Sequence, residues 1–214
     1  MSVESLEVIA EVLAAGGVVA VPTDTVYGLA VDPSRQGATS RVFLLKRRPD
    51  ALALPVLVAS LTQALALAEP AVERELRALA AAFWPGALTI VVPRRAGVAL
   101  DIGGDSMTVG VRCPARSEPR ELCQLVGPLA VTSANIHGFA PCTSVEELHS
   151  SFGSELAVLD GGRCAGVPST VVALRDGRIE PLRRGPVAVS DITDVLATVD
   201  TAVIGRPHPE PPVG

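Results

Sequence analysis

Residues 18–29 read VVAVPTDTVYGL, an apolar run that gives way to hydroxyl, carboxyl and phenol groups. A short apolar run predicts a buried strand, and Pro22 marks the residue where strand pairing ends. Thr23, Asp24 and Thr25 would then lie at the mouth of the strand, where α/β proteins often bind ligands, and Gly28 permits a close turn after them. Because Thr and Asp are also ordinary turn residues, the residues alone leave a binding site and a capped turn equally open.

Composition limits the class of protein. The chain has 214 residues, enough for one large domain or two small ones with a substantial core. Its apolar stretches are too short for a transmembrane helix of about 20 residues, and the N-terminal sequence MSVESLEV lacks a signal pattern, so we expect a cytoplasmic protein with no membrane partner. A net charge of −5 argues against a general nucleic-acid binder. The four cysteines form no CxxC pair, which disfavours a zinc site.

Periodicity predicts alternating helices and strands. We expect strands at 18–22, 54–58, 88–92, 107–111, 129–131, 157–159, 170–174 and 179–182, the last two joined as a hairpin across Asp176-Gly177. We expect helices at 5–15, 38–46, 61–68, 71–83, 118–125, 145–151 and, capped by Ser190, at 190–198. This mixture predicts an α/β (α+β) fold with a mixed sheet. One domain would span residues 1–200, followed by a flexible, proline-rich tail at 201–214.

PTDTVYGLA resembles the opening motif of the YrdC-type threonylcarbamoyl-AMP synthases. Six further blocks resemble the family in the same order, so that the likeness covers roughly residues 16 to 186. They are Lys46-Arg47-Arg48-Pro49, Phe83-Trp84-Pro85-Gly86, Val111-Arg112-Cys113-Pro114, Thr132-Ser133-Ala134-Asn135, Pro168-Ser169-Thr170-Val171-Val172 and Leu182-Arg183-Arg184-Gly185. The chain is similar to the short, single-domain form of the family. The resemblance implies a twisted mixed sheet with helices packed around it and a basic, concave active site.

The reaction implied by the resemblance joins L-threonine, bicarbonate or CO2, and ATP into threonylcarbamoyl-AMP and pyrophosphate. The product serves N6-threonylcarbamoyladenosine (t6A) modification of tRNA next to the anticodon. A carbamate oxygen attacks the α-phosphorus, so both reacting groups are anionic and the site needs fixed cations and hydrogen-bond donors. Mg2+ would be held mainly by the ATP phosphates and water, because no carboxylate cluster stands out in the sequence.

Lys46 is the only lysine among 18 basic residues, which suggests a role for its compact ammonium. If the segment before Pro49 is extended, Lys46 and Arg48 point to the same side and form a clamp for triphosphate oxygens. The resemblance gives this pair catalytic and ATP-binding roles. On the residues alone, a solvated basic run at a helix end remains the alternative.

Arg112 follows an apolar strand, and its planar guanidinium suits a carboxylate. A structural ion pair with an acidic residue is the alternative. The resemblance implies threonine binding by Thr25, Arg112, Val131 and Ser169. It implies ATP binding by Lys46, Arg48, Thr108, Ser133, Asn135 and Arg183.

Three departures from the family pattern affect side-chain selection: the apolar segment 50–55 is longer, Ala59 stands where some relatives carry His, and His137 replaces a common Ser. Two other functions stay open. One is a carbamoyl-adenylate-handling domain of the carbamoyltransferase type, and the other is a non-enzymatic RNA-binding module. We expect small-molecule substrates and a downstream tRNA threonylcarbamoyl transferase machinery as partners, and weak RNA binding stays open.

Overall fold

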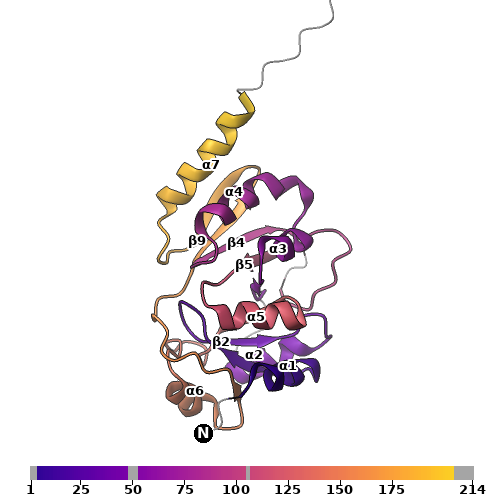
Figure 1. Cartoon of the computed structure of the whole chain (residues 1–214), viewed down its shortest axis with the longest axis vertical. Coiled ribbons are helices and arrows are strands. Elements are labelled where there is room, and N and C mark those ends of the chain that lie inside the picture. Colours follow the sequence, from indigo (N-terminus) through magenta and orange to yellow (C-terminus); the bar gives the residue numbers. More distant parts are fainter. Residues whose placement is uncertain (1–3, 48–52, 105–106, 205–214) are drawn as a thin grey trace, which may run out of the picture.

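The computed structural model describes residues 4–47, 53–104 and 107–204, and these contain one mixed sheet of nine strands (Figure 1). The order across the sheet is β7-β1-β2-β6-β3-β5-β4-β8-β9. The pairs β1–β7, β3–β5 and β4–β8 are parallel and the other neighbours are antiparallel, which confirms the predicted mixed sheet. The strands are β1 (Val19–Val21), β2 (Gly28–Val31), β3 (Val56–Leu57), β4 (Leu88–Pro93), β5 (Thr108–Arg112), β6 (Leu129–Ser133), β7 (Ala157–Val158), β8 (Thr170–Arg175) and β9 (Arg178–Arg183).

Helices connect most of the strands. Ser5 begins the first helix by accepting a hydrogen bond from the Val8 N–H, and the chain leaves it through Gly16 with a φ of 76°. Figure 1 shows α1, α2, α5 and α6 toward one end of the molecule and α3, α4 and α7 toward the other. The helices are α1 (Leu6–Ala14), α2 (Ala38–Lys46), α3 (Leu61–Leu67), the 3-10 turn η1 (Pro70–Val72), α4 (Glu73–Phe83), α5 (Ser117–Val126), α6 (Val145–Phe152) and α7 (Val189–Ile204).

Two predicted elements differ from the structure. Gly28 does not form a turn but begins β2, a strand absent from the sequence prediction. A Cβ on Gly28 would lie 2.4 Å from Cγ1 of Val131, so close strand packing accounts for the glycine. The last helix begins at Val189, so Ser190 lies inside it and does not cap it. It continues to Ile204, beyond the predicted boundary at residue 200, and residues 205–214 of the predicted tail lie outside the described residues.

The predicted hairpin is confirmed. β8 and β9 pair antiparallel, and Asp176 and Gly177 between them both have positive φ values, 49° and 72°. Turns with two positive φ values match the right-handed twist of paired strands. The hairpin places Arg183, the last residue of β9, beside the start of β8.

The two faces of the sheet are covered differently. Val56, Val111 and Ile90 are register partners on one face and belong to the larger apolar cluster, which also takes in buried residues of α2, α3, α4, α6 and α7. Leu57 on the opposite face belongs to a smaller cluster with α1 and α5. Leu57 pairs with Arg112, so this second face continues along β5 into a cavity. The uneven covering therefore positions the candidate site.

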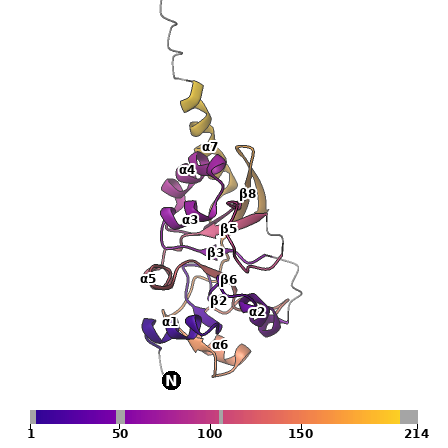
Figure 2. The same cartoon turned by 90° about the vertical axis from the view of Figure 1, so that its right-hand side faces the viewer.

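Figure 2 shows the C-terminal end of α7 projecting from the body of the molecule. Its earlier turns contribute Ile192 and Leu196 to the larger cluster. None of the helices among the described residues is long and apolar enough to cross a membrane.

Candidate active site

A cavity of about 350 Å³ lies against the second face of the sheet. Strands β4, β5, β8 and β9 contribute side chains to it. The segment after β1 and the last residues of β6 also line it. The structure brings together most of the predicted site residues, although they are far apart in the sequence. Those that line the cavity are Thr25, Thr108, Arg112, Val131, Ser133, Ser169 and Arg183.

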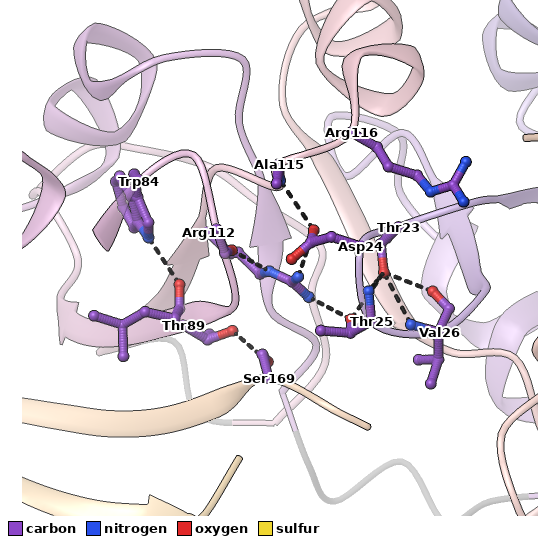
Figure 3. Close-up of polar contacts among 12 residues, drawn as sticks. Thr23, Asp24, Thr25, Val26, Trp84, Thr89, Arg112, Ala115, Arg116 and Ser169 are labelled. Atoms are coloured by element: carbon purple, nitrogen blue, oxygen red, sulfur yellow. Dashed lines mark hydrogen bonds and ion pairs between the residues drawn. The ribbon is translucent and has the colours of Figure 1, made fainter. Parts of the chain in front are cut away.

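Arg112 ends β5 as predicted, and its side chain lies in the cavity wall (Figure 3). Its Nη2 donates to Oδ1 of Asp24 at 2.8 Å, its Nη1 to Oγ1 of Thr25 at 2.9 Å, and its Nε to the Gly86 carbonyl at 3.0 Å. The ion pair that was the alternative to carboxylate binding therefore exists. Within the described residues these partners use three of the five N–H groups, so two remain for a ligand.

Burial and charge act in opposite directions on Arg112. Only 5% of the residue is exposed, and burial lowers the pKa of its guanidinium while Asp24 partly opposes that shift. Asp24 is itself fixed, because its Oδ1 also accepts a hydrogen bond from the Ala115 N–H at 2.9 Å. The pair thus holds a cation in one orientation at the cavity wall.

A second cation faces the cavity from β9. Arg183 donates from Nη2 to Oγ of Ser169 and from Nε to the Ser169 carbonyl, each at 3.0 Å. Ser169 is buried and its hydroxyl also shares a hydrogen bond with Thr89 Oγ1 at 2.9 Å. Burial, and secondarily the charge of Arg112, lower the pKa of Arg183. Repulsion between two guanidiniums is relieved when an anion binds between them, so the arrangement suits anionic ligands.

The backbone at Lys46 differs from the extended segment that the sequence predicted. It is the last residue of α2 and only 2% exposed, and Arg47 after it is left-handed with a φ of 51°. The segment is therefore not extended at Lys46 and Arg47, and the geometric argument for a clamp with Arg48 fails. Arg48 itself lies outside the described residues. Lysine here is neither a solvated surface group nor part of the cavity wall.

The Lys46 ammonium instead binds the loop that follows β6. Nζ donates to the Ser133 carbonyl, to the Asn135 carbonyl at 3.0 Å and to Asn135 Oδ1 at 2.9 Å. The Lys46 carbonyl in turn accepts from the His137 N–H at 2.9 Å. This reciprocal contact fixes the turn that presents Ser133 to the cavity.

Asn135 also acts within this loop. Its Oδ1 accepts from the Ser133 hydroxyl at 2.7 Å, and its Nδ2 donates to the carbonyls of Ile136 and Phe139, each at 2.9 Å. Asn135 does not line the cavity. Of the predicted Ser-x-Asn pair, only Ser133 therefore reaches the cavity directly.

Sequence reasoning assigned no role to Tyr27, the only tyrosine in the chain. Tyr27 is among the residues that line the cavity, and its hydroxyl donates to the Gly162 carbonyl at 2.9 Å or to Asp160 Oδ1 at 3.2 Å. Burial, aided by the charge of Asp160, raises the pKa of Tyr27 to about 12. Tyr27 thus joins the segment after β1 to the one after β7, although no local signal in the sequence reveals this contact.

Comparisons with known proteins identify the family of the chain. Residues 11–185 match the model of the Sua5/YciO/YrdC family, whose description is "Telomere recombination". The chain belongs to this family. It is 38% identical over 197 residues to a putative threonylcarbamoyl-AMP synthase of Mycobacterium tuberculosis, covering 89% of this chain and 88% of the relative. It is 34% identical over 186 residues to a threonylcarbamoyl-AMP synthase of Vibrio vulnificus, covering 85% of this chain and 98% of the relative.

A solved structure has a similar fold. The crystal structure of Pyrococcus abyssi Sua5 complexed with L-threonine superposes with a TM-score of 0.82 at 35% identity. The match covers 89% of this chain and 56% of the Pyrococcus protein. The fold of this chain is therefore that of the family, over almost its whole length.

Proposed function

We propose that this protein is a threonylcarbamoyl-AMP synthase, which forms threonylcarbamoyl-AMP and pyrophosphate from L-threonine, bicarbonate or CO2, and ATP for t6A modification of tRNA. The observation that carries the proposal is a cavity with Arg112 and Arg183 in its wall, in a chain 34–38% identical to proteins named for this activity. Two anionic substrates have to be brought together, and two fixed cations reduce the repulsion between them.

The amino acid is proposed to bind beside β5 and β6. The two remaining N–H groups of Arg112 suit the threonine carboxylate, since a guanidinium can hold a carboxylate through two hydrogen bonds. Thr25 adds a hydroxyl next to Arg112, Ser169 adds one at the opposite wall, and Val131 supplies an apolar contact. In this arrangement the carboxylate of threonine meets a cation, and its side chain meets hydroxyl and apolar groups.

The nucleotide is proposed to bind toward Thr108, Ser133 and Arg183, which also line the cavity. There Arg183 would neutralise phosphate charge while the threonine carbamate oxygen attacks the α-phosphorus and pyrophosphate leaves. Mg2+ is proposed to bind through the ATP phosphates and water, as is usual for this ion. Lys46 and Asn135 are proposed to act by holding Ser133 in place, while the role of Arg48 stays a prediction.

We also propose that residues 1–200 form the catalytic unit; α7 continues to Ile204, so residues 201–204 are helical and do not belong to a flexible tail. The product is a reactive mixed anhydride, which a tRNA threonylcarbamoyl transferase would have to consume.

Pyrophosphate release tests the proposal. The purified chain, given ATP, Mg2+, L-threonine and bicarbonate, should release pyrophosphate, and omitting threonine or bicarbonate should abolish the release. The matched control is Arg112→Gln, which removes the cation from the cavity wall. Release of ADP and phosphate, or a requirement for carbamoyl phosphate in place of threonine and bicarbonate, would contradict the proposed activity.

A further inference from the structure

The connection between β7 and β8, residues 159–169, crosses the sheet without forming a helix or a strand. Six strands lie between β7 and β8 in the sheet order, so the connection spans most of the width of the sheet. Of residues 160–167, Cys164 alone is buried. Apolar packing therefore contributes little to the position of the β7–β8 connection, and hydrogen bonds from other segments have to hold it.

Two side chains from outside the β7–β8 connection hold its first residues. Arg116 donates from Nη1 to the Gly161 carbonyl and from Nη2 to the Arg163 carbonyl at 2.9 Å. The Tyr27 hydroxyl accepts from the Gly161 N–H at 3.3 Å and can donate to the Gly162 carbonyl at 2.9 Å. The contact is close, because a Cβ on Gly161 would lie 2.6 Å from Nη1 of Arg116. Both side chains thus bind backbone groups of one short stretch.

The β7–β8 connection then reaches the cavity. The Gly166 N–H donates to the Thr25 carbonyl at 2.7 Å, which ties the connection to the loop after β1. The Thr25 hydroxyl accepts from Arg112 at 2.9 Å. Ser169, at the end of the connection, lines the cavity and accepts from Arg183. A shift of the connection would therefore move both hydroxyls of the proposed threonine site.

Arg116 acts from outside the cavity. It is not among the lining residues, and Figure 3 shows its side chain extending away from Arg112. Its backbone is nevertheless fixed beside the site, because the neighbouring Ala115 N–H donates to Asp24, the ion-pair partner of Arg112. Glu118 pairs with the Arg116 guanidinium at 3.2 Å. Arg116 thus joins the segment after β5 to the β7–β8 connection.

We propose that Arg116 is a positioning residue that holds the β7–β8 connection so that Thr25 and Ser169 keep their places in the cavity wall. This inference rests on the proposed function. A guanidinium suits the role, because its planar fork can reach two carbonyls at once. The effect falls mainly on threonine binding, because Thr108 and Ser133 of the proposed nucleotide site belong to β5 and β6 and are held by the sheet.

Backbone 15N NMR relaxation of the full chain, without substrates, tests the positioning role. Arg116→Met keeps an apolar stem but removes both donors. The order parameters of residues 161–163 should therefore fall from about 0.85 towards about 0.6, whereas that of Val131 in β6 should stay at about 0.85. Unchanged order parameters at residues 161–163, or an equal fall at Val131, would overturn the inference. A wild-type chain that makes no threonylcarbamoyl-AMP would refute the proposed function and leave this result valid.

Kinetics test the consequence for the site. Arg116→Met should raise the threonine KM roughly 3- to 30-fold and the ATP KM less than about 3-fold, because the lost bonds act on the Thr25 side of the cavity. Glu118→Gln is the matched control: it removes the ion pair but keeps Arg116 and its carbonyl contacts, so both KM values should stay within about 2-fold. A threonine KM that rises no more than the ATP KM would show a merely structural role. A Glu118→Gln penalty as large as that of Arg116→Met would assign the effect to the ion pair, and either result overturns the inference.

Discussion

Replacing Lys46 by methionine separates a structural role from a phosphate-binding one. Methionine keeps the length and apolar stem of the side chain but removes the ammonium. The substitution deprives the carbonyls of Ser133 and Asn135, and Asn135 Oδ1, of a charged donor. Oδ1 keeps the Ser133 hydroxyl as a partner, so the loss falls mainly on the two carbonyls.

The substitution removes several hydrogen bonds from a charged donor, which destabilises the fold. It also removes the free-energy cost of burying the ammonium, which offsets part of that loss. Hydrogen bonds to charged groups contribute about 1.5–3 kcal/mol each, and buried acceptors left unpaired cost about 1–3 kcal/mol. We therefore expect Lys46→Met to lower the free energy of unfolding by about 2–4 kcal/mol. For a chain of this size, this corresponds to roughly 4–16 °C in Tm. ATP-dependent product formation should fall as well, because Ser133 loses its support.

Thermal and urea unfolding measure the effect. Arg47→Met is the matched control: Arg47 is exposed, lies next to Lys46 and occupies the same helix end, so its substitution should change stability by less than about 0.5 kcal/mol. Lys46→Arg should also destabilise the fold. Lys46 is only 2% exposed, so the larger guanidinium does not fit the space that the ammonium occupies. If Lys46→Met is as stable as the wild type but inactive, Lys46 does not stabilise the loop after β6, and phosphate binding is its role.

Three further predictions concern Arg112, Tyr27 and the four cysteines. Arg112→Lys keeps the charge but loses the planar fork, so the threonine KM should rise roughly 10- to 150-fold while the ATP KM changes little; the reverse pattern would place Arg112 on the phosphate side. Tyr27 has a folded pKa of about 12 against an ordinary 10.0, so the folded state retains its proton longer than the unfolded state, and stability should fall as pH rises from about 10 to 12, by at most about 2 kcal/mol. Tyrosinate absorbance reports on this single tyrosine, Tyr27→Phe should remove that part of the pH dependence, and a titration midpoint near 10 would contradict it. All four cysteines are buried free thiols with pKa values raised by burial, so Ellman's reagent at pH 8 should react fully only after unfolding, and rapid native labelling would contradict their burial.

The strand ends of the site follow from the sequence, because apolar runs predict strands and polar residues directly after them fall at the same sheet edge. Arg112 at the end of β5 and Ser133 at the end of β6 illustrate this. The sequence did not predict β2. Gly28-Leu29-Ala30-Val31 follows the polar cluster without a break, and a glycine at that point is typical of a turn. Only the packing against Val131 explains why glycine stands in a strand.

The position of Lys46 could not be predicted, since its burial depends on acceptors that come from a loop 87 and 89 residues further along the chain. Sequence spacing indicates which side chains share a face, but not whether distant carbonyls will meet an ammonium. Local patterns thus predict where polar groups emerge, and tertiary contacts decide what each can donate or accept.

Mass spectrometry of the reaction product tests the central claim most directly. The full chain is incubated with ATP, Mg2+, 13C-bicarbonate and 15N-labelled L-threonine, and the nucleotide fraction is analysed at once, because the mixed anhydride hydrolyses. The account predicts an adenylate that carries both labels, formed together with pyrophosphate and absent with Arg112→Gln. An adenylate that carries the threonine label without the bicarbonate carbon, or no labelled adenylate from the folded wild-type chain, would contradict it.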